Sequence, residues 1–349
     1  MKRIISVWLG VALLAMLFTA CGTLEAAPTP AVTATPESIA TATPEQAPTP
    51  EEPVTFRLAG LTGPTTMGLV KLLADADAGL TENEYEFTLA GSADELTPKF
   101  VQGEIDIMAI PVNLGAILNK NTQGGLQMLS ISVLGVTYIV EKGGESIQSI
   151  ADLRGQTIYA TGKGSTPEYA LKYLLEQAGL DPETDVTIEW KSEPAEIVAL
   201  MSAQERTIAM LPQPYVTVAQ GQVEGLRVAV DMSAAWNDLN NGSLLITAGI
   251  FVRTAFAEQY PQQLETFLEE YAASVVYVND YPAEAAVLVE EIGIIKAAVA
   301  EKAIPHCHIT SITGESMKGL MENYYQILFD ANPAVVGGEM PGGGFYYGA

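Results

Sequence analysis

The chain contains 349 residues, and its 42 Asp and Glu against 17 Lys and Arg give a formal net charge of −25. This negative balance argues against nucleic acids and anionic lipid surfaces as partners. It leaves the charge of a small ligand open, because a local group of oriented backbone amides can outweigh a diffuse surface field at close range.

Residues 1–20 have the features of a lipoprotein signal peptide. Lys2 and Arg3 form a basic start, an apolar stretch follows, and small residues precede Cys21. The stretch is too short and too close to the terminus to favour a permanent membrane span. We therefore predict a palmitate-type lipid anchor at Cys21, on the extracytoplasmic face of a bacterial membrane. A cleaved signal followed by an incidental cysteine is the alternative.

The next segment, 21–53, predicts a disordered linker. After Cys21 it contains repeated Thr-Pro pairs, no aromatic residue and no Lys or Arg. Such a composition cannot bury enough apolar surface to fold, so the segment would act as a spacer between the anchor and the folded body. With Cys21 lipidated, Cys307 has no partner for an intrachain disulfide, and the body must be held by packing.

The body contains an internal repeat, in which residues 55–118 reappear in outline at 157–219. Each copy predicts a strand, a Gly/Thr turn, a helix, a strand, a second helix and a buried strand that ends in proline. Two similar lobes with a cleft between them follow from this pattern. We predict a first lobe over 54–137, a second lobe over 138–244, and a return to the first lobe over 245–349.

Individual elements can be placed within these lobes. Strands are predicted at 54–59, 105–110, 156–160 and 207–211, and the apolar runs 129–140 and 244–252 are where the chain would cross between lobes and return. Helical patterns follow at 264–275, 283–300 and 315–329. The glycine-rich end of the chain predicts a flexible terminus, whose Phe345, Tyr346 and Tyr347 could dock back on the body.

Two loops at helix starts are candidate ligand contacts. In the second lobe, either Ser165 caps the helix with Glu168 returning the bond, or Thr166 caps it with Pro167 in the first helical position. Both arrangements predict free backbone N–H groups from Ser165 to Glu168, which favour a ligand at the end of the strand. Plain helix capping is the alternative. The candidate residues are Gly164, Ser165 and Thr166 here, and Gly63, Thr65, Thr66 and Met67 in the corresponding loop of the first lobe.

The last strand of each repeat ends in a second pair of candidate contacts. Pro111 is followed by Val112 and Asn113, and Pro212 is followed by Gln213, Pro214 and Tyr215. Asn and Gln carry both a donor and an acceptor, and Tyr can stack or donate, which suits a small polar or heterocyclic ligand. Each proline could equally serve only to stop a strand and start a helix.

Motifs for catalysis and cofactors are absent from the sequence. Gly162 to Thr166 fails the phosphate-loop pattern, because Thr157 and Gly164 occupy positions that require Gly and Ser or Thr. His306, Cys307 and His308 form the one ligand-like cluster, with both histidines on one face if the backbone is extended, but two imidazoles rarely suffice for a metal. We therefore predict no enzyme activity, no cofactor and no metal site.

The stretch SIADLRGQTIYATGKGSTPEYALKYLLEQAGLDPETDVTI, with GEIDIMAIP before it and IAMLPQPYVTVA after it, resembles the solute-binding lipoproteins of ABC importers. It is most similar to the nitrate, sulfonate and taurine group, which includes binders of thiamine-precursor pyrimidines. The resemblance implies a type II periplasmic-binding fold, an α/β fold with two lobes, each a mainly parallel sheet flanked by helices, joined by two crossovers. It places ligand contacts at Gly63 to Met67, Val112, Asn113, Ser165, Thr166 and Gln213 to Tyr215.

The charge of these loops departs from the family pattern. Members that bind sulfonate or carboxylate often use Arg in the cleft, whereas Lys163 is the only cation in the loops of this chain. Tyr138, Tyr159, Tyr169 and Tyr215 are expected near them, which favours a neutral or heterocyclic solute. The resemblance implies a monomeric receptor that delivers one small molecule to a membrane permease with its ATPase. The alternatives are an enzyme of cofactor biosynthesis on the same fold and a membrane-tethered solute sensor.

Overall fold

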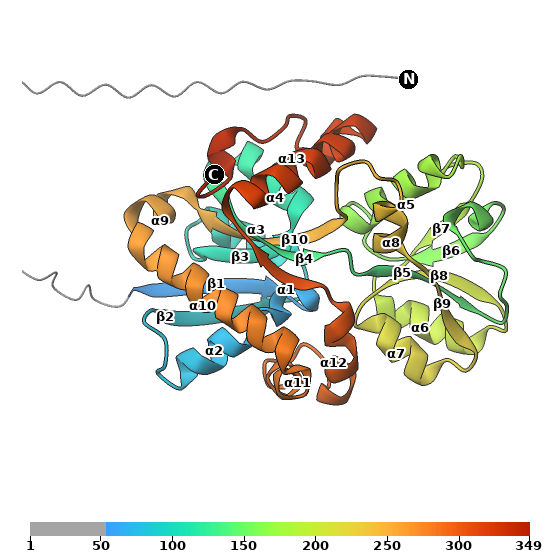
Figure 1. Cartoon of the computed structure of the whole chain (residues 1–349), viewed down its shortest axis with the longest axis horizontal. Helices are drawn as coiled ribbons and strands as arrows, with labels where there is room; N and C mark the ends of the chain where they lie inside the picture. Colours follow the sequence, from blue (N-terminus) through green and yellow to red (C-terminus); the bar gives the residue numbers. More distant parts are fainter. Residues whose placement is uncertain (1–53) are drawn as a thin grey trace, which may run out of the picture. The chain divides into compact units, whose positions relative to one another are not determined.

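Two β-sheets organise residues 54–349, which are the residues that the computed structural model describes (Figure 1). All of them belong to one unit of the chain, Glu52–Ala349. The predicted signal peptide at 1–20, the lipidation site at Cys21 and the linker at 21–53 lie outside the described residues, so they stay predictions.

The first sheet has the strand order β11-β4-β10-β3-β1-β2. Its parallel pairs are β1 with β2 and β1 with β3, and the strands β10, β4 and β11 are antiparallel to their neighbours. The strands are β1 (Thr55–Leu61), β2 (Glu84–Ala90), β3 (Ile107–Pro111), β4 (Leu126–Leu134), β10 (Ile246–Arg253) and β11 (Ile309–Ile312).

The second sheet repeats this arrangement with the order β7-β6-β8-β5-β9. Its strands are β5 (Thr137–Lys142), β6 (Thr157–Ala160), β7 (Thr187–Trp190), β8 (Thr207–Pro212) and β9 (Leu226–Asp231). Again three strands are parallel, β7, β6 and β8, and the other two are antiparallel. The predicted order of elements within each repeat is therefore confirmed. Each sheet has a parallel group of three strands, beside which the strands of the crossovers add antiparallel pairs.

Helices flank both sheets, and we call each sheet with its helices a lobe (Figure 1). In the first lobe they are α1 (Pro64–Met67), α2 (Val70–Asp77), α3 (Ala93–Val101), α4 (Val112–Asn121), α9 (Thr254–Gln259), α10 (Pro261–Asp280), α11 (Pro282–Glu291), α12 (Ala297–Ala303) and α13 (Gly314–Ala331). In the second lobe they are α5 (Thr166–Gln177), α6 (Pro194–Ala203), α7 (Tyr215–Gln222) and α8 (Met232–Asn237). Among residues 54–349, no helix combines the length and apolar character needed to cross a membrane.

The chain crosses between the sheets in two places. The apolar run predicted at 129–140 is two strands, β4 and β5, which lie in different sheets and are separated by Gly135 and Val136. A Cβ atom on Gly135 would lie 2.2 Å from Ser233 Oγ and 2.8 Å from Leu245 Cδ2, so any larger residue at this crossing would force these side chains to move. The return runs from β9 through α8 to β10. The exact lobe boundaries stay a prediction.

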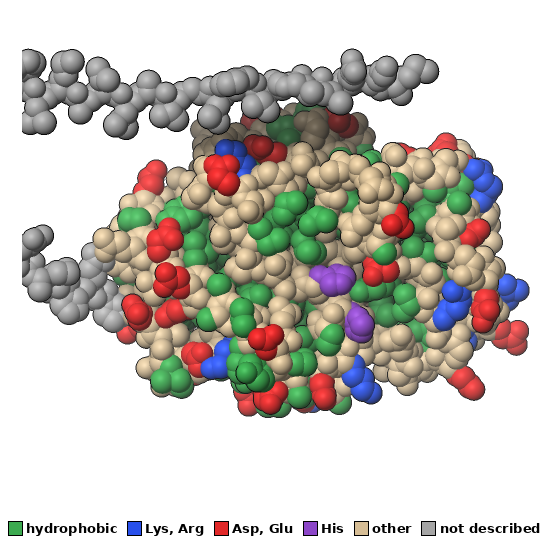
Figure 2. Space-filling model, in the orientation of Figure 1, with side chains coloured by type: hydrophobic (Ala, Val, Ile, Leu, Met, Phe, Trp, Pro, Cys, Tyr) green, Lys and Arg blue, Asp and Glu red, His purple; other side chains and the backbone are tan. Residues whose placement is uncertain are grey.

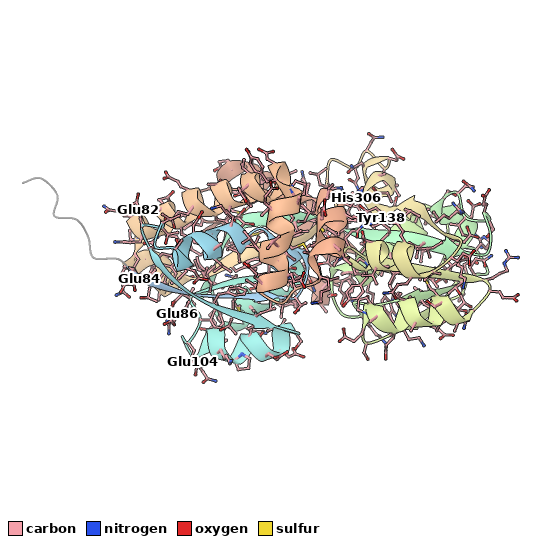
Figure 3. The ribbon with its side chains drawn as sticks, turned by 90° about the horizontal axis from the view of Figure 1, so that it is seen from below. Glu82, Glu84, Glu86, Glu104, Tyr138 and His306 are labelled. Atoms are coloured by element: carbon pink, nitrogen blue, oxygen red, sulfur yellow. The ribbon has the colours of Figure 1, made fainter. Side chains whose placement is uncertain are left out.

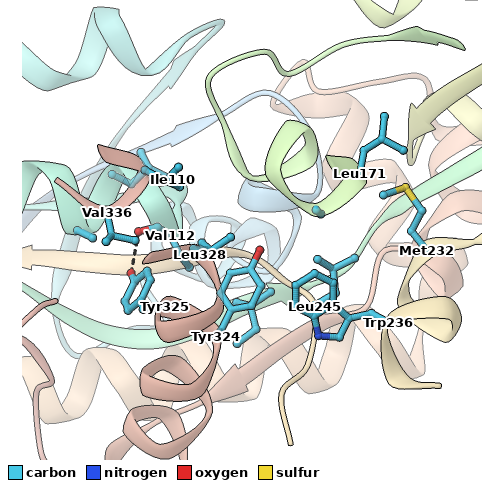
Figure 4. Packing of buried hydrophobic residues seen from close by; sticks show 14 of the residues in the cluster. Ile110, Val112, Leu171, Met232, Trp236, Leu245, Tyr324, Tyr325, Leu328 and Val336 are labelled. Atoms are coloured by element: carbon cyan, nitrogen blue, oxygen red, sulfur yellow. Dashed lines mark hydrogen bonds between the residues drawn. The ribbon is translucent and has the colours of Figure 1, made fainter. Parts of the chain in front are cut away.

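A shared apolar core joins the lobes along one side (Figure 4). Trp236 on α8 is fully buried, and its ring lies 4.7 Å from that of Tyr173 on α5 and 5.5 Å from that of Tyr324 on α13. Leu171, Met232 and the neighbouring residues of α13 belong to the same cluster. Since α13 belongs to the first lobe and α5 and α8 to the second, the lobes are held together by side-chain packing as well as by the crossovers.

The C-terminal residues are ordered, which corrects the prediction of a flexible terminus. Phe345 and Tyr346 are buried, and the Tyr347 N–H donates to the carbonyl of Met128 on β4 at 3.0 Å. The Tyr347 hydroxyl donates to Glu265 on α10 at 2.9 Å. The docking of the three aromatic residues is thus confirmed: together they bury apolar surface, which outweighs the flexibility of the glycines beside them.

Exposed carboxylates lie along β2, which is an edge strand of the first sheet (Figure 3). Glu84 and Glu86 are exposed on this edge strand, and Glu82 and Glu104 lie near it. Charged side chains on an edge strand discourage pairing with another chain. This part of the negative charge therefore has a structural explanation.

Candidate functional site

A cleft of about 400 Å³ opens between the two lobes. Its size is within the range of small-molecule sites. The lining residues are 62–65, 91, 136–137, 161–162, 167, 192–194, 212–215, 247 and 294–295. The cleft therefore takes residues from both lobes and from the first crossover.

Strand ends and helix starts place these residues at the cleft. Residues 62–65 follow β1, and Gly91 follows β2 in the parallel part of the first sheet. Residues 161–162, 192–194 and 213–215 follow β6, β7 and β8, which form the parallel part of the second. The carboxyl edges of two parallel strand groups thus face one space, and this is where open α/β sheets bind ligands.

The candidate contacts predicted from the sequence divide into two groups. Those that line the cleft are Gly63, Thr65, Gln213, Pro214 and Tyr215. Those that lie outside its lining are Thr66, Met67, Val112, Asn113, Gly164, Ser165 and Thr166. Ligand binding by any of these residues stays a prediction.

Several residues of the second group make contacts within the protein. Asn113 is fully buried; its Oδ1 accepts a hydrogen bond from the Thr166 hydroxyl at 3.2 Å, and its Nδ2 lies 3.5 Å from the carbonyl of Gly164. Thr66 is also buried and donates to the Leu61 carbonyl at 2.7 Å. The loops after β3 and β6 therefore bind one another across the lobes.

The start of α5 differs from both capping arrangements predicted from the sequence. The helix begins at Thr166, but the hydroxyl of the preceding Ser165 donates to the Gly162 carbonyl at 2.8 Å. The Glu168 carboxylate accepts the N–H of Gly164 at 2.6 Å. The expected row of free N–H groups is largely absent: the N–H groups of Ser165 and Glu168 are bonded to carbonyls in the loop, and Pro167 has none. Within residues 54–349, the Thr166 N–H is the one of this row that has no hydrogen bond.

The starts of α6 and α7 are satisfied in a similar way. The Glu196 carboxylate accepts the N–H of Ser192 at 3.1 Å, just before α6. The side-chain carbonyl of Gln213 accepts the Thr217 hydroxyl at 2.9 Å and the Thr217 N–H at 3.3 Å, in the first turn of α7. In the second lobe, a side-chain oxygen of the protein therefore accepts a backbone N–H at or just before the start of each helix that begins at the cleft.

Among the lining residues, Glu193 is the one Asp, Glu, His, Lys or Arg. Tyr215 lines the cleft with it, and partial burial together with the negative charge of Glu193 raises the pKa of the Tyr215 hydroxyl. Lys163 is exposed and lies outside the lining. The cleft therefore combines a neutral phenol, one carboxylate and many hydroxyl groups.

The other tyrosines expected near the ligand lie outside the lining. The Tyr138 hydroxyl donates to the carbonyl of His306 at 3.2 Å (Figure 3). The ring of Tyr159 lies beneath the ammonium group of Lys191, 5.4 Å from its centre. Tyr169 lies within α5. Of the four tyrosines, Tyr215 is thus the one that can contact a ligand in the cleft.

Sequence reasoning missed Ile294 and Ile295, which line the cleft. We expected one helix over 283–300, whereas the chain forms α11 and α12 with a loop between them. Gly293 has a φ of 84°, a left-handed conformation that commonly ends a helix. This glycine was the signal for a helix end, and the turn that it forms brings the two isoleucines to the cleft.

The sequence His306-Cys307-His308 is not extended, so the condition under which both histidines would share one face is not met. His306 ends a short 3₁₀ helix (Ile304–His306), and His308 has a positive φ of 45°. Nδ1 of His308 is hydrogen-bonded to the carbonyl of Gly135 at the first crossover. Cys307 is buried, donates its S–H to Ala303 at 3.2 Å, and has a pKa raised by burial. Both histidines reach the surface at the junction of the lobes (Figure 2).

Metal binding has no support at this sequence. Among residues 54–349, no group of three or more His, Cys, Asp or Glu side chains is arranged to hold a metal ion. His308 instead connects the segment before β11 to the crossover between β4 and β5. Its contacts indicate a structural role where the lobes meet.

The chain is similar to known proteins in both sequence and fold. A model of the NMT1-like family matches residues 67–293. An ABC transporter from Parabacteroides distasonis is 21% identical with a TM-score of 0.70, over 84% of this chain and 98% of that one. The periplasmic aliphatic sulphonate-binding protein SsuA from Escherichia coli is 20% identical with a TM-score of 0.63, over 80% and 88% of the respective chains. The periplasmic nitrate-binding protein NrtA from Synechocystis PCC 6803 is 15% identical with a TM-score of 0.53, over 68% and 66%.

These solved structures share the two-lobed type II periplasmic-binding fold with this chain. No curated protein matches the sequence. The family model, however, covers well over half of the residues, and most of both lobes. The chain belongs to the NMT1-like family.

Proposed function

We propose that this protein is the solute-binding component of an ABC importer. The observation that carries the proposal is the cleft of about 400 Å³, whose lining comes from corresponding strand ends of two similar lobes. Its family and its likeness to an ABC transporter and to two periplasmic binding proteins support the same function. Binding would bury one small molecule between the lobes, with no bond made or broken.

Delivery requires that the cleft opens and closes. The two crossovers between the sheets are the natural hinge, because few residues there need to change their backbone angles. Closure would favour retention of the solute, and the permease would favour the open form. The partners are thus the solute, a membrane permease and, through it, an ATPase.

The cellular location belongs to the same proposal. A lipid on Cys21 would anchor the protein at the extracytoplasmic face of the membrane, and the segment after it would allow the folded body to reach the permease as a monomer. The named neighbours are transport and binding proteins, which favours a receptor over an enzyme of cofactor biosynthesis. A membrane-tethered sensor would use the same cleft and would differ only in the partner that it contacts.

A thermal-shift screen of the purified full chain tests this function. The panel contains organic cations, neutral heterocycles, amino acids, sulfonates and inorganic anions. A solute at about 1,000 times its Kd should stabilise the protein by about 4 kcal/mol. We expect one chemical class to raise the Tm, and Thr65→Trp, which fills the cleft, to remove this effect.

The matched control is Thr88→Trp, since Thr88 is exposed on β2 in the same lobe and lies outside the cleft. It should leave the shift unchanged. If no class of solute raises the Tm, or if Thr65→Trp binds as the unmodified protein does, the receptor function is wrong.

A further inference from the structure

The chemistry of the cleft indicates which class of solute it takes. We infer that the cleft binds a small organic cation whose charged group carries N–H donors, such as an amidinium, guanidinium or primary ammonium ion, and that Glu193 supplies its counter-charge. This inference rests on the proposed function and names the solute class for the same cleft.

The first step is that side-chain acceptors of the protein already bind backbone N–H groups at the three helix starts of the second lobe. Glu168 accepts the Gly164 N–H before α5, and Glu196 accepts the Ser192 N–H before α6. The side-chain oxygen of Gln213 does the same in the first turn of α7. A helix N-terminus attracts anions through its free N–H groups, and two of these three starts already have a carboxylate of the protein itself. An anionic solute would therefore meet negative charge where it would need donors.

The second step is the absence of cations from the lining. No Lys, Arg or His is among the lining residues. Lys172 is paired with Glu168 at 3.1 Å and with Glu183 at 3.0 Å. Lys191 pairs with Glu189 at 3.3 Å and lies over the ring of Tyr159. Lys163, which follows the lining residue Gly162, is exposed and lies outside the lining. The lining itself therefore supplies no cation for an anionic solute, and Lys172 and Lys191 have carboxylate partners.

The third step is the position of Glu193. It lines the cleft just before α6, and none of the salt bridges formed by residues 54–349 includes it. Its side chain also accepts the N–H of Glu196 in a capping box. A carboxylate has about four acceptor positions, so one bond to the helix leaves several for a ligand. Removing a carboxylate from water in a closing cleft favours a cationic partner.

The rest of the lining suits the same class of solute. The negative charge of nearby Glu193 contributes to raising the pKa of the Tyr215 hydroxyl, so the phenol stays neutral. The face of the Tyr215 ring can also contact a cation. Hydroxyl oxygens of Thr65, Thr161 and Ser192 can accept N–H groups, and Ile294 and Ile295 can cover an apolar part. The inferred solute therefore differs from the sulphonate and nitrate named for two of the structural neighbours.

Isothermal titration of the purified full chain with matched compounds tests the inference. The first set of probes is benzamidinium, benzamide and benzoate, which share size and shape and differ in charge. A second set compares aliphatic guanidinium and ammonium compounds with neutral and carboxylate compounds of similar size. We expect at least one cation to bind at least tenfold more tightly than its neutral counterpart, with the carboxylate weakest. Glu193→Gln should weaken binding of the cation at least tenfold and leave the neutral compound unchanged.

Glu189→Gln is the control, because it removes one negative charge from β7, just outside the cleft. It should leave the affinity for the cation within twofold. The inferred solute class is wrong if the anion binds best and Thr65→Trp abolishes that binding, or if Glu193→Gln leaves the affinity for the cation unchanged. In either case the receptor function stands. If neither these compounds nor the wider panel bind, both are wrong.

Discussion

The hydroxyl of Thr166 donates a hydrogen bond to Oδ1 of Asn113 at 3.2 Å, and this bond links the second lobe to the first. Both residues are fully or almost fully buried. The family resemblance implies that both contact ligand, yet in this structure they bind one another beside the cleft. The lobes are thus held together at this point by the protein itself, and a solute need not bridge these two residues for the cleft to close.

Asn113→Ala should weaken the contact between the lobes. The change leaves the buried Thr166 hydroxyl without its acceptor, which should lower the free energy of unfolding by about 1–3 kcal/mol. It should also increase the distance between spin labels placed on α3 and α6, as measured by pulsed electron paramagnetic resonance without solute.

Asn119→Ala provides the comparison for this variant. Asn119 lies on the same helix and donates to the carbonyl of Leu126 at 2.6 Å, within the first lobe. Its loss should reduce stability without changing the distance between lobes. Equal label distances in the two variants would show that the Asn113 bond does not hold the lobes together.

Tyr324 and Tyr325 should respond in opposite ways to loss of the hydroxyl. Both are fully buried on α13, but the Tyr325 hydroxyl donates to the carbonyl of Val112 at 2.7 Å, whereas that of Tyr324 has no hydrogen-bond partner among the described residues (Figure 4). Tyr325→Phe should lower the free energy of unfolding by about 0.5–1.5 kcal/mol. Tyr324→Phe should be neutral or stabilising, because it removes an unpaired polar atom from the core. Urea denaturation measures both, and a larger loss for Tyr324→Phe would contradict the structure.

Gly135→Ala should disturb the first crossover. Rotation of Ser233 could relieve one of the contacts of the added methyl group, but Leu245 would remain within 2.8 to 2.9 Å. We expect a loss of about 1–3 kcal/mol, as for other overpacked sites. Gly319→Ala is the matched change: this glycine lies in the middle of α13 with nothing within 4 Å of the added Cβ, so it should stabilise the protein by about 0.5–1 kcal/mol. Similar effects of the two changes in thermal unfolding would argue against a tight crossover.

Glu141 should contribute to the loss of stability in acid. Burial alone would raise the pKa of its carboxyl group, but hydrogen bonds from Ser146, Ile147 and Arg227 outweigh burial and lower the pKa below its ordinary value of 4.5. A group with a lowered pKa in the folded state stabilises the protein above its unfolded pKa, and this contribution is lost as the pH falls through the folded value. The free energy of unfolding should therefore fall from about pH 4.5 downward.

Glu141→Gln should reduce this dependence on pH and lower stability at neutral pH by about 1.5–3 kcal/mol, because Arg227 loses a charged partner. Glu145→Gln makes the same change in charge at an exposed neighbouring position and serves as the control. Urea titrations at a series of pH values measure both effects. The assignment is wrong if the two variants show the same slope below pH 4.5.

The sequence by itself was sufficient for the architecture. Apolar periodicity and the prolines at 111 and 212 predicted two equivalent units, and β1 to β3 and β6 to β8 follow that order. These signals are local: a strand or helix depends mainly on residues near it in the chain. The repeat also predicted two lobes with a cleft between them, and the family resemblance added the type of fold and the loops expected to contact ligand.

Only the tertiary structure decided which side chains face the cleft. Periodicity carried the predicted helix through Gly293, so Ile294 and Ile295 were missed. The capping pattern suggested that Glu168 returns a bond to Ser165, whereas its carboxylate accepts the N–H of Gly164. Neither pattern could show that Asn113 meets Thr166, whose position is set by packing of the other lobe. Contacts between residues distant in the chain depend on how complete lobes pack together, and that information is not present in any short stretch of sequence.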